Sequence, residues 1–290
     1  MSLLVRRGLT LAELMVAMVL LAIVSTGLYK ALVTHQRAFQ SQVQRSDLAQ
    51  NIRAAAAILP QELRELDAAD GDIIAMSSTS LTIRAYRQFG IICSAPVLGG
   101  ALTARTYTVR SPLMSSTRAL TTTDSVLIYY EGNPGVRSDD AWVLSSVTST
   151  ATAAITCPDG KAGIQITGNL TINAPQTNTA GYIPVGAPIR GFETVTYKLY
   201  NETDGNWYLG LQPGSGTTVP LIGPLTGNAG LTFVYLNSAS AVTATRTGVA
   251  QIQIVLLAKT AQSLWQSSGT FAPAVDSVTL VATLRNNPRF

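Results

Sequence analysis

The feature that most constrains this chain is an apolar segment near its N-terminus that contains a single acid. Residues 14–24, LMVAMVLLAIV, include no polar side chain, and weaker apolar character continues to Val33. A helix over residues 9–33 is about 37 Å long at about 1.5 Å per residue, enough to cross a hydrocarbon core of about 30 Å. We therefore predict a transmembrane helix over residues 9–33.

Two basic residues, Arg6 and Arg7, precede this segment. Positive charge on this flank predicts that the N-terminus stays in the cytoplasm and that the rest of the chain lies outside. A cleaved secretory signal is the alternative, but it would have a short apolar region followed by a site of small residues. The helical pattern instead continues without a break, which favours a retained membrane anchor.

The second half of the predicted helix is one-sided. Apolar residues recur every three or four positions within residues 35–66, at Leu48, Ile52, Ala55, Leu59, Leu63 and Leu66. This spacing predicts an amphipathic helix with one apolar stripe facing a core, and Phe39 and Val43 lie off that stripe. Pro60 has no N–H and disfavours helix at the residue before it, so we expect a kink, or a break and restart, there.

The N-terminal residues RRGLTLAELMV resemble the signature of type IV prepilins: a short basic leader, a glycine, a hydrophobic residue, a threonine and a glutamate at the fifth position after the cut. The resemblance implies that residues 1–8 are a leader peptide, that a prepilin peptidase cuts after Gly8, and that the new N-terminus at Leu9 is methylated. Two departures are mild: Leu9 replaces the commonest phenylalanine, and Ala12 replaces a larger aliphatic residue.

Cleavage would give Glu13 a physical role. A charge in hydrocarbon costs roughly 2–4 kcal/mol even on the gentler insertion scales. The cut would create an ammonium at Leu9, one helical turn from Glu13, and a neighbouring subunit's ammonium could serve equally. Because removing one partner of a buried pair costs about 3–5 kcal/mol, Glu13 would favour packing that supplies an ammonium. A snorkelling interfacial acid in an isolated monomer is the alternative.

After Asp70 and Gly71 the apolar period changes to two, which predicts antiparallel strands rather than helices. Alternation is clearest over residues 73–86, 193–211, 231–236, 251–259 and 277–285, and Asp204-Gly205 marks a hairpin turn. Further strands are predicted over residues 125–132, 141–147 and 163–172. We expect long loops in the less patterned residues 87–123 and 173–192.

The order of motifs over residues 187–286 also resembles the large minor pilins of the W type and the J-type minor pseudopilins of type II secretion. The likeness covers residues 1–66 and 187–286, and the middle has no counterpart. It implies an α+β fold, with a pilin helix over residues 9–66 packed on an antiparallel, sheet-rich domain over residues 70–290. In this family that domain lies in the periplasm or outside the cell.

The two cysteines, Cys93 and Cys157, belong to no CxxC motif or Cys/His cluster, which argues against zinc. In an oxidising compartment they would form a disulfide closing a loop of about 65 residues, worth roughly 4 kcal/mol by chain entropy. We favour this pairing for an exported chain, and two buried thiols are the alternative.

Composition and motifs offer no catalytic set. The chain lacks GxSxG, HExxH and both phosphate-binding glycine motifs, and its one histidine, His35, is isolated. The loop with Glu131, Asn133, Asp139 and Asp140 does not follow EF-hand spacing, so a solvated turn is preferred over calcium. The tryptophans, Trp142, Trp207 and Trp265, are interpreted as core or sheet-face aromatics.

The net charge is +4 with no basic cluster beyond the leader, so nothing favours nucleic acid as a partner. We therefore expect no enzyme activity, no cofactor, no metal and no small-molecule substrate. The expected partners are the peptidase, other major and minor pilins or pseudopilins, and the inner membrane. The preferred function is a minor pilin that primes a type IV pilus at or near its tip. The alternatives are a type II secretion pseudopilin, and a membrane-anchored adhesin or enzyme with a prepilin-type signal.

Overall fold

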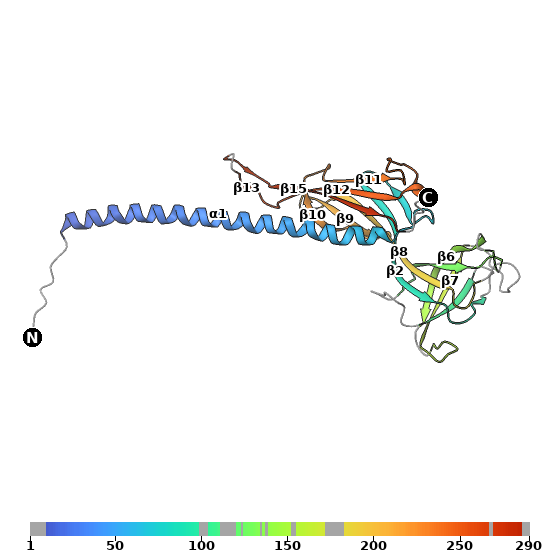
Figure 1. Ribbon diagram of the computed structural model, residues 1–290. Helices are drawn as coiled ribbons and strands as arrows, with labels where there is room; N and C mark the ends of the chain where they lie inside the picture. The colour runs from blue at the N-terminus through green and yellow to red at the C-terminus, as the bar shows by residue number, and fades with distance from the viewer. Residues whose placement is uncertain are drawn as a thin grey trace, which may run out of the picture.

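A computed structural model of the chain describes residues 10–98, 104–110, 120–122, 124–133, 135–136, 139–151, 155–171, 183–266 and 269–285. One long helix runs beside a sheet-rich body, and part of that body extends past the helix C-terminus (Figure 1). The expected α+β fold is confirmed, since a single long helix is combined with a large antiparallel sheet.

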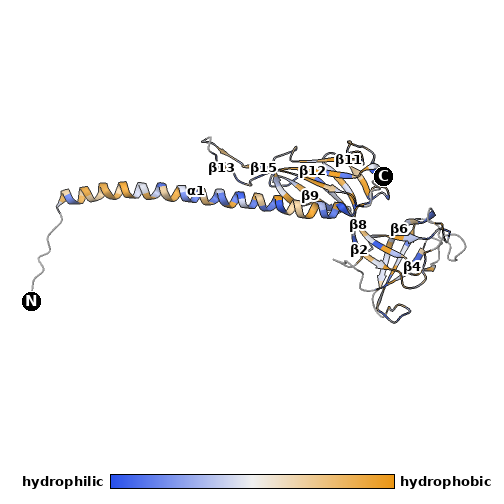
Figure 2. Cartoon of the chain, viewed as in Figure 1, coloured by the Kyte–Doolittle hydropathy of each residue, from blue (hydrophilic) through white to orange (hydrophobic). Residues whose placement is uncertain are grey.

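Helix α1 (Leu11–Arg64) carries two different surfaces. Its N-terminal half is apolar and projects free of the sheets, whereas its C-terminal half is mixed in polarity and packs against them (Figure 2). The predicted stripe forms the contact: Leu48, Ala55, Leu59, Leu63 and Leu66 are buried and Ile52 is partly buried. Burying a leucine side chain stabilises a fold by about 1.5–3 kcal/mol, so this stripe anchors the helix.

Of the two outcomes expected at Pro60, the break and restart does not occur, since α1 continues through Pro60 to Arg64, and the kink stays a prediction. Proline removes the hydrogen bond to the carbonyl four residues earlier, which belongs to Ala56. Ala56 is exposed, so water can satisfy its carbonyl. The neighbouring Leu59 and Leu63 are each 1% exposed, and their burial holds the turn in place.

Among the described residues, thirteen strands form one sheet in which every pairing is antiparallel. They are β1 (Ile73–Met76), β2 (Ser80–Ile91), β3 (Val97–Leu98), β4 (Ala104–Arg110), β5 (Ser125–Tyr130), β6 (Ala141–Ala151), β7 (Gly163–Leu170), β8 (Pro188–Asn201), β9 (Trp207–Pro213), β10 (Val219–Leu225), β11 (Leu231–Leu236), β12 (Gln251–Lys259) and β15 (Val275–Thr283). A short helix, η2 (Arg246–Gly248), precedes β12, and β13 (Leu264–Trp265) pairs with β14 (Phe271–Ala272) in a separate hairpin.

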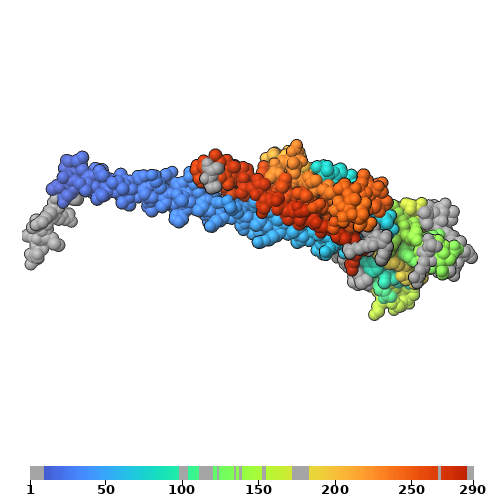
Figure 3. Space-filling view, turned by 45° about the horizontal axis from the view of Figure 1, so that its top comes forward, coloured from blue at the N-terminus to red at the C-terminus, as the bar shows by residue number. Residues whose placement is uncertain are grey.

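Two long strands connect two buried cores. The first half of β2 pairs with the second half of β8. Both halves belong to the part of the sheet that packs against α1, here called the helix-packed lobe, whose core includes Leu59 and Ile254. The remaining halves carry the sheet into a distal lobe, residues 92–187, whose separate core includes Tyr107 and Ile166. Figure 3 shows the distal lobe, in green, beyond the C-terminal end of the helix.

The predicted long loops are partly wrong. β2 continues to Ile91, β4 occupies Ala104–Arg110 and β8 begins at Pro188. The alternation of β4 was hidden because one of its buried residues, Arg105, is charged. Residues 111–119 and 173–182 of the predicted loops, and residue 172 at the end of a predicted strand, lie outside the described part of the chain.

Candidate functional site

The N-terminus of α1 is closed by a reciprocal pair of side chains. Thr10 is the N-cap, and its hydroxyl accepts a hydrogen bond of 3.3 Å from the backbone N–H of Glu13. In return, Oε2 of Glu13 accepts from the Thr10 backbone N–H at 2.9 Å and from the Thr10 hydroxyl at 3.0 Å. This capping box satisfies N–H groups that would otherwise be unpaired at the start of a helix.

Glu13 therefore has a local partner that the sequence interpretation did not include. The missed residue is Thr10, and its signal was present, since Thr-x-x-Glu before an apolar run is the sequence pattern of a capping box. A carboxylate has about four acceptor positions. Both hydrogen bonds from Thr10 go to Oε2, and no described residue donates to Oε1 of Glu13.

The other N-terminal residues named from the sequence, Arg6, Arg7, Gly8 and Leu9, lie outside the described residues. The basic leader, the cut after Gly8 and the methylated Leu9 therefore stay predictions. The structure does fix the start of the helix, because α1 begins at Leu11, the third residue after the predicted cleavage point.

The surface that follows Glu13 suits a membrane. α1 contains a stretch long and apolar enough to cross a bilayer, and none of that stretch is buried within the structure. Two of its polar side chains are satisfied by its own backbone: the hydroxyl of Thr26 donates to the Ala22 carbonyl at 2.7 Å, and that of Thr34 donates to the Lys30 carbonyl at 2.9 Å. Such bonds lower the penalty of placing hydroxyls in hydrocarbon.

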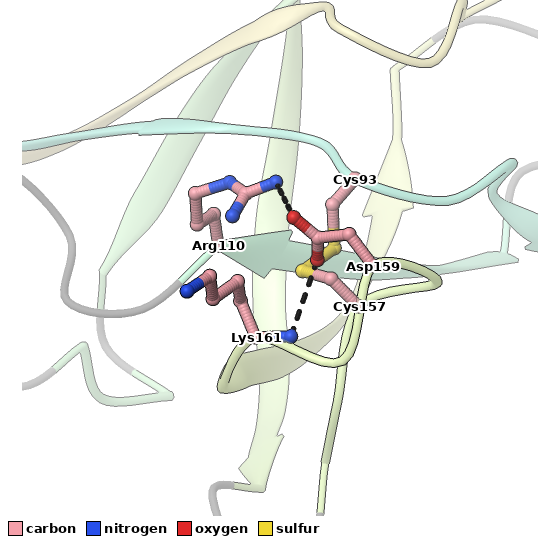
Figure 4. The surroundings of a disulfide bond; sticks show 5 residues. All are labelled: Cys93, Arg110, Cys157, Asp159 and Lys161. Carbon is pink, nitrogen blue, oxygen red and sulfur yellow. Dashed lines mark hydrogen bonds and ion pairs between the residues drawn. A yellow bond between two sulfur atoms is a disulfide. The ribbon is translucent and has the colours of Figure 1, made fainter.

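The cysteines form a disulfide within the distal lobe. Cys93 follows β2, Cys157 precedes β7, and their Cα atoms are 5.6 Å apart. Beside the disulfide, Arg110 donates to Asp159 at 2.6 Å, as Figure 4 shows. This hydrogen bond holds the pKa of the Asp159 carboxyl below its usual value. The disulfide therefore ties two segments that are 64 positions apart in the sequence.

The acidic loop is organised by hydrogen bonds within the protein. Asp139 accepts from the backbone and side-chain nitrogens of Asn133, both at 2.8 Å, and Asp140 accepts from the Tyr129 hydroxyl at 2.7 Å. Across the described residues, no group of three or more His, Cys, Asp or Glu side chains is arranged to hold a metal. Oδ1 of Asp139 is buried, so this side chain is not fully solvated, and the preference for a turn over calcium stays a prediction.

The tryptophans differ from one another. Trp142 packs edge-on to Tyr129 with ring centroids 6.1 Å apart, and the Arg190 guanidinium lies 4.3 Å from the Trp142 ring. Trp207 packs against the core of the helix-packed lobe. Trp265 is not a core residue: it is 52% exposed and lies on the two-stranded β13–β14 sheet.

Comparison with protein families finds one match: residues 4–29 fit the model of the prokaryotic N-terminal methylation motif. The matched residues include the basic flank, the predicted cleavage point, the capping box and most of the exposed apolar helix. No curated protein and no solved structure matches the chain.

Proposed function

Because residues 4–29 carry the N-terminal methylation motif of type IV prepilin-like proteins, we propose that this chain is a minor pilin of a type IV pilus. Its leader is cut after Gly8, Leu9 is methylated, and the processed subunit waits in the inner membrane. It then helps to prime filament assembly and occupies a position at or near the tip. The chain catalyses no reaction itself.

The observation that supports this proposal most directly concerns Glu13, at the start of an exposed apolar helix. Only one of its two carboxylate oxygens accepts hydrogen bonds from described residues. Exposed side chains such as Leu14, Leu21 and Ile23 have no partner surface within the described residues, so lipid would cover them first and neighbouring helices afterwards. Oε2 of Glu13 is occupied by Thr10, while Oε1 can accept the ammonium of a processed terminus. In a helical bundle this pairing would select the stagger between neighbouring subunits.

The disulfide supports a periplasmic position for the sheet-rich body. Disulfides persist in oxidising compartments such as the bacterial periplasm and are rare in the cytosol. The Cys93–Cys157 disulfide joins segments of the distal lobe. The predicted topology places the N-terminal flank in the cytoplasm and the sheet-rich body in the periplasm. The disulfide would then lie in an oxidising compartment, where disulfides persist.

The distal lobe supports a position at or near the tip. It extends beyond the C-terminal end of α1, on the side away from the apolar half of the helix (Figure 1). In a filament of roughly parallel helices, the next subunit towards the tip would occupy space in that direction. A bulky lobe there limits stacking above this subunit but leaves its helix free to receive subunits below.

The test is Glu13→Ala, with Asp47→Ala as the matched control. Asp47 is an exposed acid on the same helix, outside the apolar span. The Glu13 variant should be cut and membrane-bound yet absent from sheared filaments, whereas the Asp47 variant should behave as wild type. Filament counts by electron microscopy and immunoblots of sheared fractions measure this. Wild-type incorporation of the Glu13 variant would overturn the pairing.

Position is tested separately by immunogold labelling of an epitope in the distal lobe. Gold at filament ends supports the tip assignment, and regular gold along the shaft contradicts it. Deletion of the gene should reduce piliation. If it instead abolishes secretion of folded proteins while pili remain, the chain is a secretion pseudopilin.

A further inference from the structure

The β13–β14 hairpin presents two large aromatic side chains to the surroundings. Trp265 is 52% exposed and Phe271 is 59% exposed, and their ring centroids are 5.1 Å apart in an edge-on arrangement. The neighbouring Leu264 is only 5% exposed, so it packs into the protein while the two aromatic side chains face outwards. Contiguous exposed apolar surface marks interaction sites, whereas apolar residues scattered singly need no explanation.

The hairpin is attached to α1 at a defined level. The guanidinium carbon of Arg37 lies 5.9 Å from the Trp265 ring and 6.0 Å from the Phe271 ring. The Gln262 backbone N–H donates to the Gln44 side chain at 3.3 Å. In Figure 1 the hairpin reaches along the helix towards its free apolar half. We call Arg37, Trp265 and Phe271 the interfacial patch.

If the predicted span crosses a bilayer, the patch would lie close to the lipid headgroups. The predicted span ends at Val33, and Arg37 follows four residues later, which is about 6 Å along a helix. The headgroup region on each side of a bilayer is about 5–8 Å thick. A core of about 30 Å corresponds to about 20 helical residues, which reach Val33 when they are counted from Leu14, the residue after Glu13. With that placement, an aromatic pair at the level of Arg37 would fall inside the headgroup region rather than in bulk water.

We propose that the interfacial patch rests on the outer leaflet of the inner membrane before the subunit enters a filament. Trp265 and Phe271 lie among the headgroups and upper acyl chains, and Arg37 faces lipid phosphate. Tryptophan is enriched at membrane–water interfaces because its ring is apolar and its N–H is polar. The patch also continues the exposed apolar surface of α1, and no acidic residue occurs between Glu13 and Asp47 to repel phosphate.

Such a contact would hold the helix-packed lobe against the bilayer and limit its swing about the helix. The proposal rests on the membrane anchoring in the proposed function. The competing occupant is the helix of a neighbouring pilin inside a filament, and the experiment below separates the two.

The experiment uses the full-length chain in vesicles of phosphatidylethanolamine and phosphatidylglycerol. Its two cysteines are paired with each other, so an introduced cysteine can carry a single spin label. Three labelled variants are compared: Phe271→Cys in the patch, Leu21→Cys in the span, and Val242→Cys as the matched control. Val242 is 77% exposed, and its bridge to Leu236 puts it at the opposite end of β12 from the hairpin.

We expect the label at position 271 to be several-fold less accessible to a water-soluble nickel chelate than the label at position 242. The label at position 21 should be accessible only to oxygen. If 271 matches 242 while 21 is buried in lipid, the interfacial proposal is overturned and the anchor stands. If 21 is accessible to the chelate, the anchor itself fails. Protection of 271 only in assembled filaments assigns the patch to a neighbouring subunit and overturns the lipid contact.

A second measurement keeps an aromatic ring at both positions of the patch, 265 and 271. Lipids brominated near the glycerol end of the acyl chains should quench wild-type tryptophan fluorescence, and Trp265→Phe should lose most of that quenching. Trp142 and Trp207 provide the background signal in the variant. Equal quenching of the two proteins would overturn the proposal without involving a cysteine substitution.

Discussion

The guanidinium of Arg87 lies 2.6 Å from the carboxylate of Glu62, which joins the last turns of α1 to strand β2. Arg87 is the residue at which the β2–β8 register shifts, between Tyr86 and Gln88. It also contacts Glu193 of β8 at 3.3 Å. The helix is therefore tied to the point where the shared sheet leaves the helix-packed lobe for the distal lobe.

Replacing Arg87 with leucine should destabilise the protein by about 2–4 kcal/mol, because two carboxylates would remain close together without their cation. The matched control is Arg110→Leu, which removes an ion pair of the same 2.6 Å length whose side chains are 45% and 46% exposed. That loss should be much smaller, because water screens an exposed ion pair. Urea unfolding of the full chain in detergent measures both variants. Equal losses would show that the Arg87 contacts contribute no more than an exposed pair.

Removing the disulfide should loosen the distal lobe selectively. Cys93→Ala with Cys157→Ala frees a loop whose ends are 64 positions apart, and the chain-entropy model gives a loss of about 4 kcal/mol. Hydrogen exchange should show lost protection in β4 and β7 but retained protection in β12, whose residues belong to the other core. Uniform loss of protection over both lobes would contradict the separate-core description.

Two aspartates should give opposite pH dependence. Burial raises the pKa of Asp72 above its usual value of 3.8, so its ionised form is disfavoured in the folded state. The ionised Asp72 carboxylate therefore lowers the stability of the folded protein most at pH values above its folded pKa. Protonation removes this penalty as the pH falls through that pKa. The Asp72→Asn variant should therefore lose its advantage over wild type as the pH falls through the folded pKa of Asp72 towards its usual value of 3.8.

Asp159 is the comparison, because its bond to Arg110 lowers its pKa. Its favourable contribution is present above its unfolded pKa and is lost as pH falls through the folded pKa. The Asp159→Asn variant should therefore be less stable than wild type at neutral pH, and this deficit should shrink towards zero as the pH falls. Unfolding curves at several pH values measure both differences, and slopes of the same sign would contradict the assignment.

Processing is tested at Gly8. Gly8→Ala should accumulate as an uncut precursor that still starts at the leader, because the prepilin resemblance assigns the cut to this glycine. Gly27→Ala is the control, since a methyl group added at Gly27 meets nothing within 4 Å. N-terminal sequencing should find Leu9 first in the control and in wild type. Leu9 as the first residue of the Gly8 variant would refute the leader assignment.

The sequence predicted those features that depend on neighbours along the chain. The apolar stripe of α1 and the alternation in β12 were predicted correctly because each periodicity reflects one buried face. Thr10 was overlooked although its capping pattern is local. Strand β4 was missed because buried Arg105 interrupts its apolar alternation.

Local sequence alone determined the long helix, its apolar half, the acid at its head and most of the strands, because backbone geometry translates residue spacing directly into faces. Tertiary structure alone decided that Arg87 meets Glu62 and Glu193, the latter 106 positions away, and that Trp265 meets Arg37. Pairing of distant strands depends on the whole packed sheet, and no short window contains that information. The division into two lobes arises in the same way, from β2 and β8 running side by side through both.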